Sequence, residues 1–331
     1  MSRPGLSPVR WTPPAPGPDR PDPLPPLTVV PVPGEGPEDV LVAPDGTVWT
    51  GLADGRVLRY RPDHGDLDVV VDTGGRPLGL EWLPDGRLLV CDARRGLLAV
   101  DVSARPAAVE VLATEAAGRP LVFCNNAAAL ADGSVWFTDS SSRFGIDHWK
   151  GDILEHSGTG RLLRRDPSGD IEAVVTGLQF ANGVAASPDG GAVFYAETGS
   201  YALSRVATSG PTAGRATRVV DALPGFPDNI ALGSDGLVWV AIASPRNPLV
   251  DRLAGMPPVL RRLVWAMPEA LQPKPELRTR VAAVDPSSGR TVRDLDGVDP
   301  GFGMATGVRE AAGVVWLGSL QGTTIASFRL P

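Results

Sequence analysis

The sequence predicts an all-β fold, a six-bladed β-propeller with four antiparallel strands in each blade. Two observations carry this prediction: a composition rich in turn-forming residues and a repeated hairpin pattern. Gly and Pro account for 39 and 34 of the 331 residues, which leaves little room for long helices and favours many short strands. Apolar residues make up 43% of the chain, enough to fill a sizeable core.

The repeated unit is a pair of apolar strands joined by a turn that reads Asp-Gly or close to it. The copies read VLVAPDGTVWTG, GLEWLPDGRLLVCD, AAALADGSVWFTD, GVAASPDGGAVFYAE, IALGSDGLVWVA and GVREAAGVVWLG. The turn residues are Asp45, Asp85, Asp132, Asp189 and Asp235, with Ala312 in the sixth copy. Asp-Gly between apolar runs is a strong hairpin signal, because glycine accepts the positive φ of tight turns. A third apolar run and, in most copies, a fourth follow each hairpin, and four-stranded units of this length form propeller blades.

The N-terminal region is expected to be an arm, followed by the propeller. Residues 1–26 are rich in proline, which fixes φ and removes backbone donors, so we expect an extended surface segment. Residues 27–331 form the propeller. Its sixth repeat has three strands, and the run at 27–32 is expected to add the fourth and close the ring. An insertion at about 244–277 in the fifth blade predicts short helices packed on the propeller; a lid and a membrane-surface contact are the alternatives.

Composition also restricts the partners. The net charge of −7 argues against binding to nucleic acid, which requires a basic face. No apolar run reaches about 18 residues, so no membrane span is expected. Cys91 and Cys124 are too few for a disulfide framework or a four-cysteine zinc site. The N-terminus lacks a secretory pattern, so we expect a cytoplasmic protein that acts on a small molecule; the sequence does not define an oligomeric state.

Candidate metal ligands emerge when the repeats are aligned on the turn. The residue seven positions before the turn starts the innermost strand, and rotation should gather the six copies around the channel. The six are Glu38, Leu78, Asn125, Asn182, Asp228 and Ala305. Four carry side-chain oxygens, and two of these are carboxylates, which repel each other unless a cation or proton lies between them. Such hard donors suit Ca²⁺, so Glu38, Asn125, Asn182 and Asp228 are predicted to bind Ca²⁺ or another divalent cation.

Residues for substrate binding and catalysis follow from the same register. Two positions before the ring residues, on the same strand face, lie Phe123, Phe180 and Phe226, with Arg76 in the second copy. We expect these side chains to form a collar around a small organic substrate. The second hairpin strands end in Asp92, Asp139 and Glu197, which are candidates for supporting hydrogen bonds or for a general base. Asp139 is the preferred catalytic candidate of the three, because a polar loop follows it.

Several stretches resemble the strictosidine synthase-like branch of the senescence-marker-protein/gluconolactonase superfamily. They read FTDSSSRF, GRLLRRDP, LQFANGVAASPDG, LPGFPDNIALGSDGLVWVAIASPRNP and KPELRTRVAAVD, and the resemblance extends from about Gly36 to Leu330. It implies a six-bladed propeller. In the metal-dependent members (gluconolactonases, paraoxonase-like arylesterases and diisopropyl-fluorophosphatase-like hydrolases) a Glu, two Asn and an Asp hold an axial ion. That pattern falls on the four ligands chosen from the repeat register.

Two departures from the family pattern bear on the chemistry. True strictosidine synthases use a glutamate on the last blade, and the matching place here is Thr306 in GMATGV. Alkaloid-forming condensation is therefore not expected, and Thr306 is assigned to substrate binding. Paraoxonase-like enzymes place a histidine near the start of the second blade, where this chain has Leu78.

These observations together predict a calcium-dependent hydrolase of lactones or simple esters. The ion would polarise the substrate carbonyl and stabilise the oxyanion. Asp228, or a water activated by Asp228 or Asp139, would attack that carbonyl. The alternatives are a cyclase or condensing enzyme of secondary metabolism on the same scaffold, and a non-catalytic binding propeller that the ion stiffens.

Overall fold

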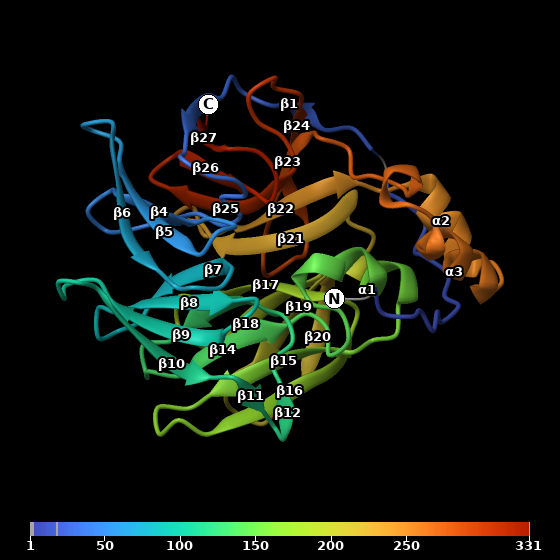
Figure 1. Cartoon of the computed structure of the whole chain (residues 1–331), viewed down its shortest axis with the longest axis horizontal. Coiled ribbons are helices and arrows are strands. Elements are labelled where there is room, and N and C mark those ends of the chain that lie inside the picture. Colours follow the sequence, from blue (N-terminus) through green and yellow to red (C-terminus); the bar gives the residue numbers. More distant parts are fainter. Residues whose placement is uncertain (1–2, 18, 331) are drawn as a thin grey trace.

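Six antiparallel sheets follow one another along the chain and form the blades of a propeller (Figure 1), which confirms the predicted fold class. The computed structural model describes residues 3–17 and 19–330. The first two positions of the predicted arm, Pro18 and the last position of the predicted propeller lie outside the described residues.

Each of the first three blades runs from an innermost strand to an outer edge strand. The first contains β3 (Leu41–Val42), β4 (Val48–Gly51), β5 (Arg56–Arg61) and β6 (Asp66–Asp72). The second contains β7 (Pro77–Trp82), β8 (Leu88–Asp92), β9 (Gly96–Asp101) and β10 (Ala108–Ala113). A small hairpin of β11 (Glu115–Ala116) and β12 (Arg119–Pro120) leads to the third blade. That blade contains β13 (Cys124–Ala129), β14 (Val135–Asp139), β15 (Gly160–Arg165) and β16 (Ile171–Leu178).

The last three blades follow the same plan. The fourth contains β17 (Ala181–Ala186), β18 (Ala192–Glu197), β19 (Ala202–Ala207) and β20 (Ala216–Val220). The fifth contains β21 (Gly225–Leu232), β22 (Val238–Pro245), β23 (Thr279–Val284) and β24 (Thr291–Gly297). The sixth contains β25 (Ala305–Ala311), β26 (Val314–Ser319), β27 (Thr324–Arg329) and β2 (Thr28–Pro31).

The Asp-Gly turns join the first two strands of each blade, as the repeat predicts. In the first blade the Asp45 carboxylate accepts hydrogen bonds from the backbone and the hydroxyl of Thr47. Gly46 has a φ of 82°, a conformation that a β-carbon disfavours. The turn therefore depends on both residues of the Asp-Gly pair.

The ring is closed by chain segments from both ends. Strand β2 pairs antiparallel with β27, with Thr28 opposite Ser327, which confirms closure by an N-terminal strand. The proline-rich arm also contributes β1 (Asp22–Pro23), which pairs parallel to β24 and makes the fifth blade five-stranded. The sequence does not predict β1, because proline argues against a strand; a two-residue edge strand tolerates it, since one side needs no donor.

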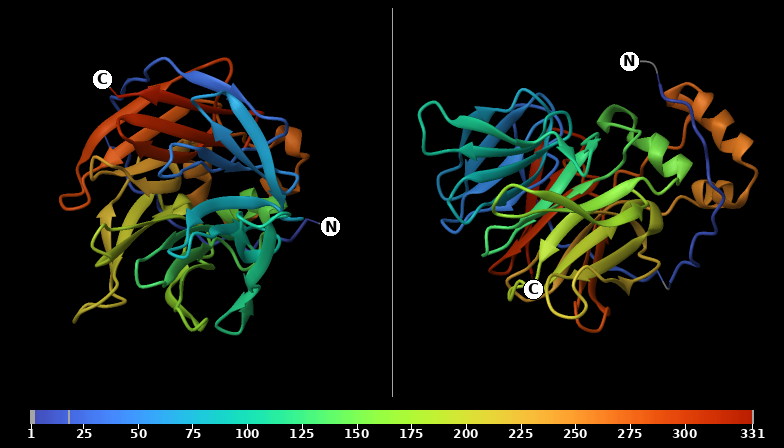
Figure 2. Two further views of the ribbon diagram at one scale, coloured as in Figure 1. Left: turned by 90° about the vertical axis from the view of Figure 1, so that its left-hand side faces the viewer. Right: turned by 90° about the horizontal axis from the view of Figure 1, so that it is seen from below.

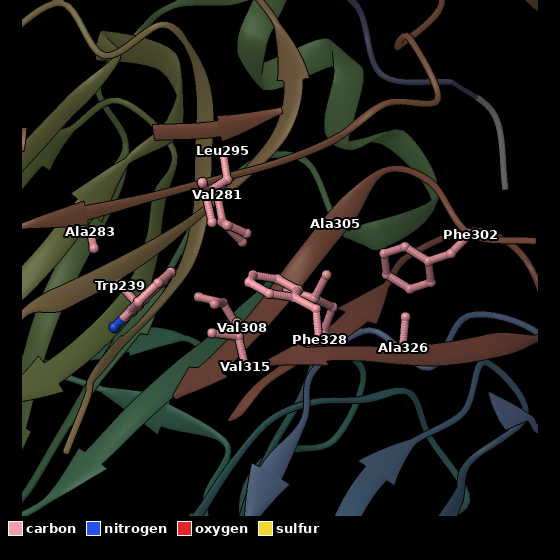
Figure 3. Packing of buried hydrophobic residues seen from close by; sticks show 12 residues of the cluster. Trp239, Val281, Ala283, Leu295, Phe302, Ala305, Val308, Val315, Ala326 and Phe328 are labelled. Atoms are coloured by element: carbon pink, nitrogen blue, oxygen red, sulfur yellow. The ribbon is translucent and has the colours of Figure 1, made fainter. Parts of the chain in front are cut away.

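Hydrophobic residues fill the space between neighbouring blades. Figure 3 shows one such cluster, in which side chains of the fifth blade meet those of the sixth. Trp239 and Val281 come from the fifth blade, and Val308 and Phe328 come from the sixth. Equivalent clusters between the other blades hold the sheets in fixed positions around the axis.

Short helices gather on one side of the propeller (Figures 1 and 2). They are η1 (Ile146–His148), α1 (Trp149–Glu155), η2 (Thr198–Ser200), α2 (Pro248–Gly255), α3 (Pro258–Ala266) and η3 (Glu269–Leu271). The predicted insertion supplies α2 and α3; α2 begins where the Asn247 side chain accepts from two backbone N–H groups and Pro248 follows. The sequence does not predict α1. No helix among the described residues has the length and apolarity needed to cross a bilayer.

Candidate metal centre

A β-bulge lies at the start of the innermost strand in most blades. In the third blade the pairing of β13 with β14 shifts between Cys124 and Ala127, so Asn125 and its neighbour oppose one residue. The same shift brackets Asn182 in β17 and Asp228 in β21. Bulges redirect side chains and are frequent next to functional sites. In these three blades each bulge contains a candidate ligand and the residue that follows it.

The four predicted ligands line one cavity at the end of the channel. Glu38, Asn125, Asn182 and Asp228 come from the first, third, fourth and fifth blades, and Leu78 completes the wall from the second. Ala305, the sixth member of the register, is fully buried and is not among the lining residues. The structure therefore brings together the four oxygen-bearing residues that the repeat register selects.

The two asparagine amides are held with their oxygens unpaired. The Asn125 Nδ2 donates to Ser140 Oγ at 2.9 Å, and the Asn182 Nδ2 donates to Thr198 Oγ1 at 3.1 Å. Both amide oxygens are buried, yet neither forms a hydrogen bond to any residue that the structure describes. A buried acceptor without a partner costs free energy. A hard cation would satisfy both oxygens at once.

The two carboxylates lie in an environment that disfavours their charge. Burial raises the pKa of Glu38 well above its ordinary value, the Asp228 and Asp39 carboxylates raise it further, and the Arg76 guanidinium opposes the change. Burial likewise raises the pKa of Asp228 to about 7. A cation between the carboxylates offsets their repulsion and favours their charged form. The donor set thus fits a divalent cation.

The donor set is also selective for hard metals. Among residues 3–17 and 19–330 no three His, Cys, Asp or Glu side chains cluster in a way that could hold a metal ion. The candidate centre instead combines two carboxylates with two amides, and neither sulfur nor imidazole takes part. Such oxygen donors suit Ca²⁺ or Mg²⁺ and not Zn²⁺.

A second ring of polar residues lies directly beside the four ligands. It consists of Asp39, Asn126 and Asn229, each following a ligand in sequence and each buried. The Asn229 Nδ2 donates to both Glu38 carboxylate oxygens at 3.1 and 3.2 Å, and its Oδ1 accepts from Asn126 Nδ2 at 3.0 Å. Asn126 Oδ1 in turn accepts from the Val184 backbone. This network links the blades and orients Glu38.

Glycine allows this second ring to pack closely. In the fourth blade the position after the ligand is Gly183, and a β-carbon there would lie 2.3 Å from the Ile230 backbone nitrogen and 2.6 Å from the Asn229 Cα. No side chain fits at that spacing. The Asn229 backbone can lie this close to the fourth blade because its neighbour there, Gly183, carries no side chain.

Aromatic and aliphatic side chains form the cavity walls. Phe123, Phe180 and Phe226 all line the cavity, as predicted for the collar. Phe123 and Phe180 pack edge to face with their ring centroids 5.4 Å apart. Beyond them, Trp149 and Ile153 of α1 extend the apolar wall. A largely apolar cavity with a few converging polar groups is typical of small-molecule sites.

Two residues predicted to bind substrate do not line this cavity. Arg76 is buried, and its Nη1 donates to the Gly36 carbonyl at 2.8 Å. Thr306 is fully buried, and its hydroxyl donates to the Glu38 carbonyl at 2.7 Å. Both side chains thus act on the backbone that carries Glu38. The register places their Cα atoms correctly, but their side chains turn away from the cavity.

Asp139 is also placed away from the cavity, which corrects its assignment as a catalytic residue. Its carboxylate is fully buried, pairs with Arg161 Nη2 at 2.6 Å and accepts from the Phe123 backbone at 2.8 Å. The predicted alternatives Asp92 and Glu197 accept from the Arg76 and Gln179 backbones in the same way. By accepting these hydrogen bonds, the three carboxylates hold the backbone at the start of the innermost strands.

Two functional residues were not predicted from the sequence: Ser140 and Thr198, which follow Asp139 and Glu197. Besides holding the amides, the Ser140 hydroxyl donates to the Ala181 carbonyl and the Thr198 hydroxyl donates to the Pro227 carbonyl. Each therefore joins its own ligand to the backbone of the next blade. The sequence did offer a signal for them: in both the third and the fourth repeat, an acidic residue at the end of the second strand is followed by a hydroxyl residue.

Helix α1 and the insertion form part of the cavity wall, and the N-terminal arm runs beside the insertion. Helix α1 contributes Trp149, Lys150 and Ile153 to the lining, and the insertion contributes Asn247 and Val250. The insertion therefore forms part of a lid, one of the predicted alternatives. The arm runs beside the helices of the insertion (Figure 2).

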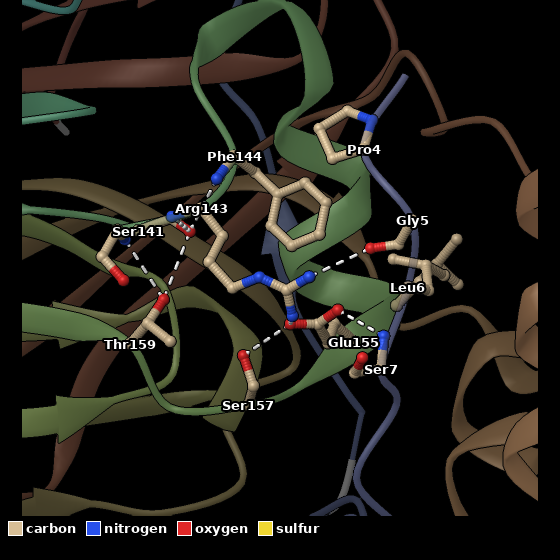
Figure 4. Close-up of polar contacts among 12 residues, drawn as sticks. Pro4, Gly5, Leu6, Ser7, Ser141, Arg143, Phe144, Glu155, Ser157 and Thr159 are labelled. Atoms are coloured by element: carbon tan, nitrogen blue, oxygen red, sulfur yellow. Dashed lines mark hydrogen bonds and ion pairs between the residues drawn. The ribbon is translucent and has the colours of Figure 1, made fainter. Parts of the chain in front are cut away.

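Hydrogen bonds tie the arm to both parts of the lid. In Figure 4, Arg143 lies between Gly5 of the arm and Glu155 of α1. The Ser7 backbone donates to Glu155 at 2.6 Å. On the insertion, Trp265 Nε1 donates to the Pro4 carbonyl at 2.7 Å. The arm thus connects α1 with α3.

The blade count and the axial ring of oxygen donors define a class of six-bladed propellers with a site on the channel axis. The chain belongs to the SMP-30/gluconolactonase/LRE-like region family, which it matches over residues 33–254. Its curated relatives include the rat adipocyte plasma membrane-associated protein, 32% identical over 89% of this chain and 83% of that protein. The Arabidopsis thaliana protein strictosidine synthase-like 6 is 34% identical over 69% of this chain and 61% of its own length.

Solved structures show the same fold. A gluconolactonase from Xanthomonas campestris superposes with a TM-score of 0.65 at 19% identity, covering 92% of this chain and 89% of that one. A calcium-binding regucalcin from Agrobacterium tumefaciens gives a TM-score of 0.61 at 15% identity, covering 90% of each chain. At these identities the likeness concerns the fold alone.

Proposed function

We propose that this protein is a calcium-dependent hydrolase of lactones or simple esters. The observation that carries the proposal is the pair of orphaned amide oxygens on Asn125 and Asn182, buried in one cavity with two carboxylates. The family includes gluconolactonases by name, and a structural relative binds calcium by its description. Both facts agree with the donor set.

The cavity residues divide into metal ligands, a base and an apolar wall in the proposed reaction. Glu38, Asn125, Asn182 and Asp228 would hold the ion, which supplies Lewis acidity toward a substrate carbonyl. Asp228 is proposed to accept the proton of the attacking water, because its carboxylate lines the cavity and the ion would keep it ionised at neutral pH. Phe123 and Phe180 hold the apolar part of the substrate and exclude bulk water.

A matched pair of variants tests this proposal. Hydrolysis of a lactone series and an aryl ester series is measured before and after chelation and after Ca²⁺ is restored. Asp228→Asn should lower kcat by about 10²–10⁴-fold, the usual contribution of a general base. Asp235→Asn is the control, because Asp235 is the exposed turn residue of the same blade. Activity that survives chelation or Asp228→Asn would remove the mechanism; Ca²⁺ binding without turnover of either series would favour a non-catalytic propeller.

We also propose a cytoplasmic location. Cys91 and Cys124 are both buried and both free, which agrees with a reducing compartment. Alkylation of the denatured protein isolated from its native host should label both thiols, whereas an oxidised pair would argue for another compartment.

A further inference from the structure

The chain uses lysine at only two positions, and both line the cavity. Of its 31 basic residues, all but Lys150 and Lys274 are arginines. These two lysines lie on separate lid elements and both contribute to the cavity wall. Lysine presents a compact, mobile point charge, while arginine prefers planar, bidentate partners. The distribution singles out the cavity as the one place where this chain presents ammonium groups.

Lys274 is placed at the open side of the cavity. It lies in the segment after η3, and its neighbours Pro273 and Pro275 line the cavity with it. The two prolines restrict the backbone on either side. Lys274 is exposed and forms no ion pair with any residue in the described ranges. Its charge is therefore available to a ligand.

Lys150 has a partner that a ligand can replace. Its Nζ pairs with Glu269 Oε1 at 2.8 Å, and the side chain of Glu269 is 68% exposed. An ion pair with one partner so exposed contributes only about 0–1 kcal/mol. The Lys150 side chain itself is 22% exposed and also contributes to the cavity wall. A ligand anion can compete with Glu269 for this ammonium group.

The cavity thus changes character along its depth. Glu38 and Asp228 lie at the channel end, Phe123 and Phe180 surround the middle, and the lysines lie on the lid. The cavity therefore has an acidic end that fits a cation, an apolar middle and a basic end. A substrate that complements it has a carbonyl at one end, an apolar body and an anionic group at the other end. Charge complementarity of this kind directs orientation as well as affinity.

We propose that Lys150 and Lys274 bind an anionic group of the substrate, a carboxylate or a phosphate, separated from the scissile carbonyl by an apolar body. This inference rests on the proposed hydrolase function and names the substrate class for it. The anion lies between the two lid elements, the apolar body lies among the aromatic side chains, and the carbonyl reaches the four ligands. The lysines are specificity residues and take no part in bond cleavage.

Matched esters test the proposal by kinetics. The phenyl half-ester of suberic acid carries a carboxylate, and phenyl octanoate has the same chain length without it. We expect a lower KM for the half-ester in the wild-type protein, and its advantage over phenyl octanoate should fall about tenfold in the Lys150→Gln/Lys274→Gln double variant, as two exposed charge contacts predict. Arg252→Gln on α2 is the control, because Arg252 is exposed and does not line the cavity.

A variant with the opposite effect sharpens the test. Glu269→Gln removes the carboxylate that competes for Lys150, so it should lower KM for the half-ester about two- to threefold and leave that for phenyl octanoate in place. Equal KM values for the two esters in the wild type, or an unchanged ratio in the double variant, would overturn the proposal while hydrolysis itself stands.

Direct binding separates this proposal from the hydrolase function. Calorimetry with 4-phenylbutyrate, 4-phenylbutyl phosphate and the neutral 4-phenylbutyramide requires no ester turnover and distinguishes the two anions. At least one anion should bind more tightly than the amide, and the double variant should lose that difference. If no ester is hydrolysed but this difference appears, the anion site stands and the hydrolase function fails. If all three ligands bind alike, the anion site is wrong.

Discussion

The substitution Thr198→Val tests whether the structure orients the ligand amides in advance. Valine keeps the volume but removes the hydroxyl that accepts from Asn182 Nδ2 at 3.1 Å and donates to the Pro227 carbonyl at 2.7 Å. Two buried polar groups then lose their partner, and each such loss costs about 1–3 kcal/mol. We take about 2 kcal/mol as the total, because the site can relax. With roughly 2.1 cal/mol/K of unfolding entropy per residue over 331 residues, Tm should fall by about 3 °C.

The same substitution should weaken Ca²⁺ binding, because Asn182 can then turn its oxygen away from the cavity. A tenfold loss of affinity lowers the stabilisation by saturating Ca²⁺ by about 1.4 kcal/mol, or about 2 °C. Calorimetric scans with and without Ca²⁺ measure both effects.

Thr279→Val provides the control for the scans. Thr279 is also fully buried, but its hydroxyl forms no hydrogen bond to the described residues. Its replacement should leave Tm unchanged or raise it. The rise of Tm on adding Ca²⁺ should be as large as in the wild-type protein. An unchanged Ca²⁺ response in Thr198→Val, or equal losses in the two variants, would refute the reasoning.

Three further predictions concern groups outside the cavity floor. Burial raises the pKa of Asp152 to about 7, so its protonated form stabilises the fold at low pH and that stability is lost as pH rises through about 7; relative to Asp152→Asn, the wild type should lose about 2–3 kcal/mol between pH 5 and pH 8 in urea titrations. Arg161→Met leaves the buried Asp139 carboxylate unpaired and should cost about 3–5 kcal/mol, measured by denaturation; a smaller loss than for the exposed pair variant Arg164→Met would contradict this. Deletion of residues 1–11 removes the carbonyl that Trp265 Nε1 contacts, so limited proteolysis should cleave the 256–275 segment faster while the propeller survives; unchanged protection would show that the arm does not hold the lid.

The repeat register made the fold predictable from sequence, together with the meeting of four oxygen-bearing residues in one cavity. Copies related by rotation place equivalent residues around one axis, so Asn125 and Asn182 could be paired with Glu38 and Asp228 without any structure. The register defines where a Cα lies on a strand. It does not define the direction that a long side chain takes.

The direction of the side chain explains why three predicted site residues do not line the cavity. Asp139 lies opposite Arg161 in the pairing of β14 with β15, so a cross-strand ion pair takes the carboxylate that the sequence assigned to catalysis. Arg76 and Thr306 have carbonyl partners within reach that an alignment of repeats does not reveal. Helix α1 was missed because its sequence, WKGDILE, has only seven residues and is stabilised by contacts with α3 and the arm.

The most direct test of the account is a crystal structure of the protein grown with Ca²⁺ and measured for anomalous scattering. We expect one ion within about 2.3–2.6 Å of the side-chain oxygens of Glu38, Asn125, Asn182 and Asp228. Amide nitrogens of Asn125 and Asn182 should remain on Ser140 and Thr198. A channel without an ion at saturating Ca²⁺, or an ion held elsewhere with those amides reversed, would contradict it.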